Sequence, residues 1–231
     1  MYMLKVIKST AALLAYKVYF PLFLLLIAYD GSKPFVEQPF FRDVPFIIVF
    51  AVYVFADAFL APLLKPPARP EPPPDKQVDQ ANLTMVVAAV RTVLIVSVFE
   101  HAKIHVLPPA TTLLAIAGSV AMFCGMMLRI LSIRAIARYY TAHMRAESDQ
   151  EIIRGGAYKY IRHPMYSGRL LFVFGFALGL FSVAGMAVAL GFLFPAYLRW
   201  AMKEERLLLS SLGERYAKYV KETKRFIPFV F

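Results

Sequence analysis

The run of residues 167–202, which is apolar almost throughout, most constrains how this chain can fold. As one α-helix it would be roughly 54 Å long, because an α-helix rises about 1.5 Å per residue. The hydrocarbon core of a bilayer is only about 30 Å thick, and about 20 apolar residues cross it. The run therefore predicts a helical hairpin that turns near residues 182–185. Small residues would let its two arms pack closely, and the candidates are Gly175, Gly179 and Gly191.

Four further runs are each long and apolar enough to cross a bilayer: 10–29, 44–64, 83–103 and 109–137. Hydrophobic residues make up 59% of the chain, and the mean hydropathy is +0.58. A soluble domain is only about 45–50% apolar. The predicted fold class is an all-α, polytopic integral membrane protein with about six transmembrane helices. Five is the alternative if the first run lies partly at the interface.

The first run could also be read as a secretory signal peptide, because Lys5 and Lys8 precede it. Lys17 and Pro21 interrupt the run, however, and no small-x-small cleavage site follows Ala28. We therefore expect a retained span.

The net charge of +11 would be compatible with a nucleic-acid-binding protein. The Lys and Arg residues, however, lie mostly between and after the apolar runs, where they meet lipid head groups and set topology. We therefore expect no nucleic-acid partner. With six spans, the basic segment 138–162 and the basic C-terminal tail fall on the cytoplasmic side, together with both termini.

A proline-rich segment, residues 65–80, predicts an extended polyproline-like linker on the cytoplasmic side. It divides the chain into an N-terminal transmembrane helix pair, 1–64, and a core, 81–231. Asp57 and Arg91 lie at similar predicted depths on either side of this linker. Because a lone charge inside a bilayer is costly, we expect the two to pair and dock the helix pair onto the core.

The segment GGAYKYIRHPMYSG, residues 155–168, carries the chemistry that a plain membrane span lacks. Pro164 can open the next helix at its first turn, which would aim that helix N-terminus at the cytoplasmic surface. Such an N-terminus favours a carboxylate or a phosphate. An interfacial belt of Tyr, Arg and His is the alternative for each residue taken singly. The carboxylates of Glu204 and Glu205 follow directly after the hairpin run.

No metal site is predicted. The single cysteine, Cys124, lies inside an apolar run, so it can form neither an internal disulfide nor a cysteine zinc cluster. His101 and His105 share a helix face beside Glu100, which is a metal-ligand spacing. They fall on the opposite side of the membrane from the segment 155–168 and lack an evident third ligand, so an interfacial role is favoured.

The motifs GGAY and RHPMYSG, then KEERLL, then LGERYAKYVKETKRFIP, resemble the isoprenylcysteine carboxyl methyltransferase family and its relatives among the phospholipid methyltransferases. The resemblance runs from about Gly125 to Pro228. It implies a membrane-embedded methyltransferase that uses S-adenosylmethionine without a Rossmann fold. The cofactor would be held between the RHP connector and the C-terminal tail region with its Glu pair, and a lipid or prenylated acceptor would arrive from the bilayer.

The resemblance also implies roles for individual residues. Carried over by motif position, the cofactor-binding residues are Tyr158, Arg162, His163, Tyr166, Glu204 and Glu205. Catalysis falls to Glu204 and Arg199, and Arg199 would also hold an acceptor carboxylate. Four residues separate Arg199 from Glu204, where the family pattern has about three. Arg129, deep in its span, is a second substrate-binding candidate, because a buried arginine in a membrane is a functional candidate by default.

Several acceptors and functions stay open at this stage. Isoprenylcysteine carboxyl O-methylation is favoured, with a phospholipid amine, a small thiol or an isoprenoid acid as alternatives. The alternatives of other classes are a nicotinamide-dependent sterol or isoprenoid reductase on a similar scaffold and a non-catalytic membrane scaffold.

We further expect a lateral opening between the fourth span and the first hairpin arm, lined by Met165, Leu170 and Phe174. The oligomeric state is not predicted.

Overall fold

A computed structural model describes residues 21–26, 28, 29, 31, 44–55, 80–104, 112–136 and 151–230. Within these ranges the regular elements are helices, and pairing of β type is limited to one isolated bridge between Ile161 and Lys224. The predicted all-α fold class is therefore confirmed.

The helices follow one another with short connections in the second half of the chain. Their bounds are α3 Val44–Phe55, α4 Gln80–Phe99, the π-helix η5 Glu100–Ile104, α5 Thr112–Ala135, the 3₁₀ helix η6 Gly156–Lys159, α6 Pro164–Gly179, α7 Val183–Val188, the π-helix η7 Ala189–Leu193, α8 Phe194–Leu212 and α9 Glu214–Glu222. A further helical turn at residues 21–26 precedes α3.

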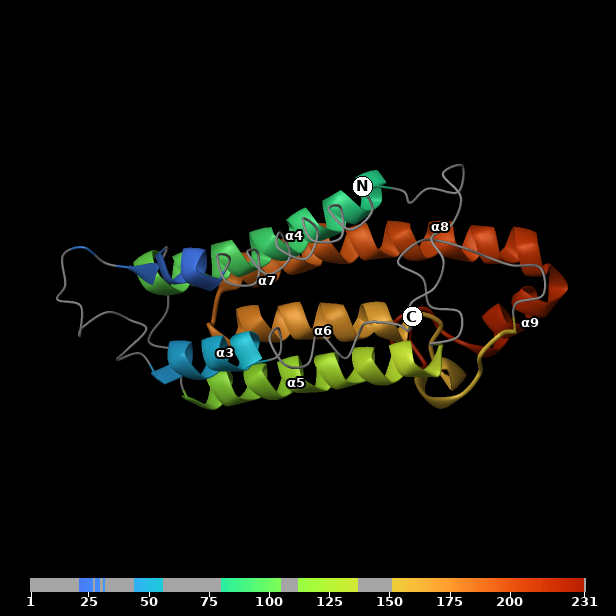
Figure 1. The fold of residues 1–231 in the computed structure, drawn as a ribbon, viewed down its shortest axis with the longest axis horizontal. Coiled ribbons are helices and arrows are strands. Elements are labelled where there is room, and N and C mark those ends of the chain that lie inside the picture. Colours follow the sequence, from blue (N-terminus) through green and yellow to red (C-terminus); the bar gives the residue numbers. More distant parts are fainter. Residues whose placement is uncertain are drawn as a thin grey trace, which may run out of the picture.

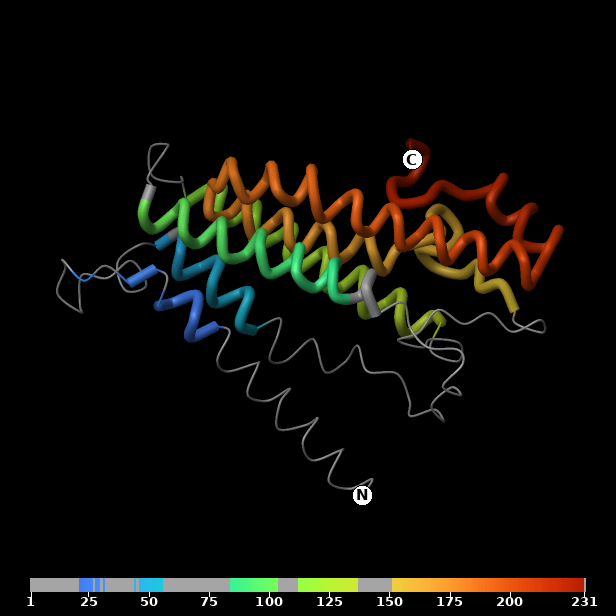
Figure 2. Tube along the Cα trace, turned by 90° about the horizontal axis from the view of Figure 1, so that it is seen from above, coloured from blue at the N-terminus to red at the C-terminus, as the bar shows by residue number. Residues whose placement is uncertain are grey.

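The long helices run side by side along one axis (Figure 1). Helix α4 and the continuous helix α7–α8 form one side of the bundle, and α3, α5 and α6 form the other. Helix α6 packs along α5 and also contacts α4 and α7, so it lies at the centre. Helix α9, η6 and the C-terminal tail gather at one end of the bundle, as Figure 2 also shows.

Among the described residues, three helices are long and apolar enough to cross a membrane: Thr84–Lys103, Thr112–Ala135 and Val183–Leu212. Their length and composition are those of an integral membrane protein. The count of six spans stays a prediction. Most of the run 10–29, the second half of the run 44–64 and nearly all of the proline-rich linker lie outside the described residues, as does Asp57. The division into 1–64 and 81–231 and the Asp57–Arg91 pair therefore stay predictions as well.

The hairpin predicted for the run 167–202 is confirmed. Its turn, residues 180–182, lies slightly before the predicted turn near residues 182–185. Helix α6 ends at Gly179, and Ser182 caps α7 by accepting a hydrogen bond from the Gly185 amide at 2.9 Å. The buried carboxylate of Glu100, in η5, holds this turn against a helix outside the hairpin. It accepts hydrogen bonds from the Ser182 hydroxyl at 2.5 Å and from the Ala184 amide at 2.9 Å.

The glycines of the hairpin do not join its two arms, which corrects the expectation from the sequence. Gly175 of α6 faces α5, where an added Cβ would lie 2.7 Å from the Gly118 carbonyl oxygen. Gly125 and Gly168 form a second contact of this kind, at 2.5 Å. Gly191 is exposed, with open space around it. The close approach that small residues allow therefore joins α6 to α5, the preceding span in the chain.

These backbone contacts also close the seam between α5 and α6, so the lateral opening expected there is wrong. The residues predicted to line this opening are instead partly buried and pack against the apolar core: Met165, Leu170 and Phe174.

Helix α8 extends ten residues beyond the end of the apolar run, to Leu212. Pro195 in its first turn lacks the amide hydrogen that would bond the fourth preceding carbonyl, and the residues just before it, Ala189–Leu193, form a π-helix. The continuous helix carries Glu204 and Glu205 past the start of α6, so the carboxylates meet the connector that precedes α6.

Candidate active site

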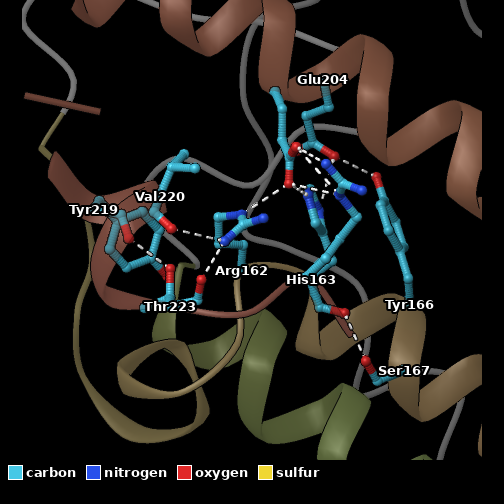
Figure 3. Close-up of polar contacts among 10 residues, drawn as sticks. Arg162, His163, Tyr166, Ser167, Glu204, Tyr219, Val220 and Thr223 are labelled. Carbon is cyan, nitrogen blue, oxygen red and sulfur yellow. Dashed lines mark hydrogen bonds and ion pairs between the residues drawn. The ribbon is translucent and has the colours of Figure 1, made fainter. Parts of the chain in front are cut away.

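The connector before α6 and the C-terminal tail are held together by backbone hydrogen bonds. The amides of Arg162 and His163 donate to the carbonyls of Lys224 and Arg225, at 2.8 and 3.1 Å, and the Lys224 amide donates to the Tyr160 carbonyl at 3.0 Å. Two segments about sixty residues apart thus run parallel beside the start of α6. The predicted meeting of connector and tail is present, and the side chains of both point toward the Glu pair of α8 (Figure 3).

Glu205 is enclosed by three basic side chains. Its carboxylate accepts hydrogen bonds from Arg162 Nε at 2.8 Å and from Arg225 Nη2 at 2.7 Å, and His163 Nε2 lies 3.1 Å from it. Only 8% of the Glu205 side chain is exposed. Hydrogen bonding to Glu205 raises the pKa of Arg225, so this guanidinium stays charged. A buried carboxylate with two guanidinium partners is compensated in charge and in hydrogen bonds.

Arg162 connects this ion cluster to helix α9. Its Nη1 donates to the carbonyls of Val220, at 3.2 Å, and Thr223, both at the C-terminal end of α9. The last carbonyls of a helix lack partners within the helix, and a basic side chain there also complements the helix dipole. Arg162 therefore joins α8, the connector and α9 through one guanidinium (Figure 3).

Glu204 differs from its neighbour by being partly open. Its carboxylate accepts a hydrogen bond from the Tyr166 hydroxyl at 2.7 Å, and His163 Nδ1 lies 3.5 Å away. The exposed fraction of its side chain is 32%. The adjacent carboxylates thus have different surroundings, because consecutive helix residues point about 100° apart. The Glu204 carboxylate can therefore contact a further partner, whereas the Glu205 carboxylate is fully occupied by its three basic neighbours.

Aromatic rings surround Tyr166 beside Glu204. The rings of His163 and Tyr166 stack at 5.2 Å between centroids, Tyr197 lies 5.3 Å from Tyr166, and Trp200 lies 6.5 Å from it. All four side chains are buried. Tyr197 and Trp200 come from α8, seven and four residues before Glu204, so they share its helix face.

Tyr158, also predicted for the site, is buried in η6 and contributes its backbone carbonyl. The Tyr219 hydroxyl of α9 donates to this carbonyl at 2.7 Å. Burial raises the pKa of Tyr219 to about 12, despite the nearby Arg162 and Arg154, so the hydroxyl keeps the proton that it donates. This bond fixes α9 against the connector.

The structure therefore brings together five of the predicted cofactor-binding residues, Arg162, His163, Tyr166, Glu204 and Glu205, with Tyr158 at the edge of the same connector. Arg199 is exposed on α8, five residues before Glu204 and so about 140° around the helix from it. Arg129 is partly buried on α5 beside Gly168, where an added Cβ would lie 2.7 Å from Arg129 Cγ. The roles assigned to these two arginines stay predictions.

Sequence reasoning missed four residues of the site. Arg225 stands within the quoted motif KETKRFIP, but nothing in its spacing indicates a partner on α8. Phe226 packs 5.9 Å from the His163 ring, again across the fold. Tyr197 and Trp200 could have been predicted from the sequence. A helix through the Glu pair places residues four and seven positions earlier on the same face as Glu204.

Residues 113–215 match the family model described as phospholipid methyltransferase. This part of the chain is therefore similar to the phospholipid methyltransferase family. The match confirms the resemblance predicted from the motifs at the level of the family. The matched segment begins in α5 and ends at the start of α9, so it contains the connector, the hairpin and the Glu pair.

Curated relatives match over part of their length. The protein-S-isoprenylcysteine O-methyltransferase of Saccharomyces cerevisiae is 23% identical over 134 residues, which are 57% of this chain and 56% of the relative. The cobalt-zinc-cadmium resistance protein CzcN of Cupriavidus metallidurans is 28% identical over 102 residues, 42% of this chain and 45% of the relative. The chain therefore spans about half the length of the curated relatives it matches.

A solved structure of the eukaryotic intramembrane Ras methyltransferase ICMT (isoprenylcysteine carboxyl methyltransferase) aligns with 94% of this chain and 96% of its own, with 18% sequence identity and a TM-score of 0.41.

Proposed function

We propose that this protein transfers a methyl group from S-adenosylmethionine to a lipophilic acceptor at the membrane interface, and that the acceptor is the carboxyl group of an isoprenylcysteine. The observation that carries the proposal is the cluster at the end of the bundle. There the segment that matches the phospholipid methyltransferase family places a partly open carboxylate, Glu204, beside stacked aromatic rings.

The side chains of the cluster fit this cofactor. When bound, S-adenosylmethionine supplies a methyl group activated by the adjacent sulfonium charge. Glu204 offers a carboxylate to such a cation, and Tyr166, Tyr197 and Trp200 offer aromatic faces, which attract cations. The N-terminus of α6, opened by Pro164, favours the carboxylate of an amino acid moiety.

The chain needs no strong acid or base for this reaction, because charge is neutralised as the methyl group moves. Alignment and exclusion of water supply most of the rate in such a displacement. The Tyr166 hydroxyl fixes the Glu204 carboxylate through its hydrogen bond, and the buried rings of Tyr197 and Trp200 keep water from that side of it.

The choice of a prenylcysteine carboxylate follows the name of the yeast relative and the bilayer setting of the fold. Arg199 or Arg129 would hold the acceptor carboxylate, because guanidinium groups bind carboxylates with two parallel hydrogen bonds. A phospholipid amine, such as that of phosphatidylethanolamine, is the second candidate acceptor, favoured by the description of the family model.

We place the site on the cytoplasmic side of the membrane. The end of the bundle that carries it is rich in exposed basic residues, among them Lys159, Lys203, Arg206 and Lys218. Basic residues near the ends of spans are enriched on the cytoplasmic side.

The test is incubation of the purified protein, in lipid vesicles, with methyl-labelled S-adenosylmethionine and either a farnesylated cysteine derivative or phosphatidylethanolamine. A methyl ester releases labelled methanol in alkali, whereas an N-methyl group is stable, so the two acceptors give different products. We expect base-labile label in the prenylcysteine, and less of it with Glu204→Gln.

Base-stable label in the phospholipid would establish the second candidate instead. Failure of S-adenosylmethionine to bind in calorimetry, together with oxidation of a nicotinamide cofactor by a sterol or isoprenoid, would replace both with a reductase. A protein that binds neither cofactor would be a non-catalytic scaffold.

A further inference from the structure

The C-terminal tail exposes apolar side chains at the end of the bundle where the candidate active site lies. Ile227 is 51% exposed, Phe229 83% and Val230 72%. The half-exposed ring of Tyr160, in the connector, lies 6.0 Å from that of Phe229. We name these four residues, Tyr160, Ile227, Phe229 and Val230, the tail patch.

The tail patch is fixed to the protein through Phe226, the residue just before it. The Phe226 carbonyl accepts a hydrogen bond from the Ser167 hydroxyl in the first turn of α6, at 2.7 Å. The buried Phe226 ring packs edge-on against Phe194 of α8, at 5.8 Å. Figures 1 and 2 both show the tail beside the N-terminal end of α6.

These contacts set the depth of the tail patch relative to the bilayer. Ser167 lies about 5 Å along α6 from Pro164, and Phe194 lies well before the polar end of α8. The tail therefore returns from α9 to the level at which α6 and α8 enter the membrane. Apolar side chains exposed at that level are expected to meet lipid rather than water.

Basic side chains border the tail patch as they border membrane interfaces. Lys159 Nζ lies 5.7 Å from the centre of the Tyr160 ring, and Lys224, beside Ile161 in the bridge, is exposed. Tyrosine and lysine are enriched where a protein crosses from the hydrocarbon core to the head groups, and lysines attract anionic lipids.

We propose that the tail patch is a lipid-binding surface, with Ile227, Phe229 and Val230 inserted at the level of the head groups and upper acyl chains, and with Lys159 and Lys224 over anionic head groups. By holding the tail at the bilayer, this contact also holds Arg225 and Phe226 in place at the candidate active site. The proposal does not depend on which reaction the site catalyses.

The test uses a single introduced cysteine, which is simple here because the chain has one native cysteine, Cys124. In the full chain with Cys124→Ser, Val230→Cys is labelled with the environment-sensitive fluorophore NBD and reconstituted in vesicles of phosphatidylcholine and phosphatidylserine. The matched control carries the label at Lys218→Cys, an exposed position on α9 beyond the end of α8. Quenching by iodide in water is compared with quenching by lipids that carry a nitroxide near the head group.

We expect the label at position 230 to be quenched several-fold more by the nitroxide lipid than the label at 218, and less by iodide. The reverse pattern, with iodide reaching position 230 as easily as 218, would mean that the tail patch faces water and awaits a protein partner, which would overturn the proposal.

A second comparison tests the lysines. Nitroxide quenching at 230 should fall when phosphatidylserine is omitted, and this dependence should be lost with Lys159→Gln and Lys224→Gln together. Equal quenching with and without phosphatidylserine would refute the role of the lysines.

Discussion

Replacing Glu205 by glutamine should lower the stability of the folded protein, although the sequence motif predicts that Glu205 binds the cofactor. The carboxylate pairs with Arg162 and Arg225 at 2.8 and 2.7 Å, and only 8% of the Glu205 side chain is exposed. A glutamine keeps the shape but removes the negative charge that both guanidinium groups contact. Removing one partner of a buried ion pair costs about 3–5 kcal/mol. For a chain of this size that corresponds to a fall in melting temperature of roughly 6–20 °C.

The neighbouring Glu204→Gln variant is the matched control, because the two residues share a helix and a chemistry but not an environment. Glu204 is partly open and bonded to a neutral hydroxyl, from Tyr166. We expect this variant to melt close to the parent protein and to bind S-adenosylmethionine more weakly by about 1–3 kcal/mol, through loss of a charge-assisted contact.

Thermal unfolding of the purified proteins in detergent and calorimetric titration with S-adenosylmethionine measure the two effects separately. We expect opposite results for the two variants: lower stability for Glu205→Gln and lower cofactor affinity for Glu204→Gln. If Glu205→Gln kept its melting temperature and lost only cofactor affinity, Glu205 would be a ligand and its ion pairs would not hold the fold.

Three further changes test the surrounding contacts. Arg162→Lys keeps the charge but cannot bridge a carboxylate and the α9 carbonyls at once, so we expect a loss of about 1–3 kcal/mol in unfolding measurements. Gly125→Ala should lower the free energy of unfolding by about 1–3 kcal/mol, because its Cβ would lie 2.5 Å from the Gly168 carbonyl oxygen. The control Gly191→Ala should leave the stability unchanged, since there is open space around Gly191. Equal melting temperatures of the two variants would contradict the close α5–α6 packing. Tyr219→Phe should cost about 0.5–1.5 kcal/mol. Because the pKa of Tyr219 is raised from 10.0 to about 12, its contribution is full below pH 10 and lost as the pH rises through 12, and the variant should lack this pH dependence.

The sequence alone was enough to predict the class of fold and the place of the hairpin. Both depend on quantities that a sequence contains, namely the length of an apolar run and the thickness of a bilayer. The motif around His163 and the Glu pair likewise indicated the family, since their order and spacing are linear features. The partner of the hairpin glycines could not be predicted this way, because a small residue permits close approach without specifying which helix approaches.

Only the tertiary structure separated the roles of two adjacent carboxylates. In the sequence, Glu204 and Glu205 are equivalent, and Arg225 is one of several basic residues in the tail. The turn of about 100° per helix residue points Glu205 toward the connector and the tail, and Glu204 toward Tyr166. Whether a carboxylate is saturated or open depends on which charges the fold brings within about 3 Å of it. Those charges come from residues twenty and forty-three positions away along the chain, a distance over which local sequence patterns carry no information.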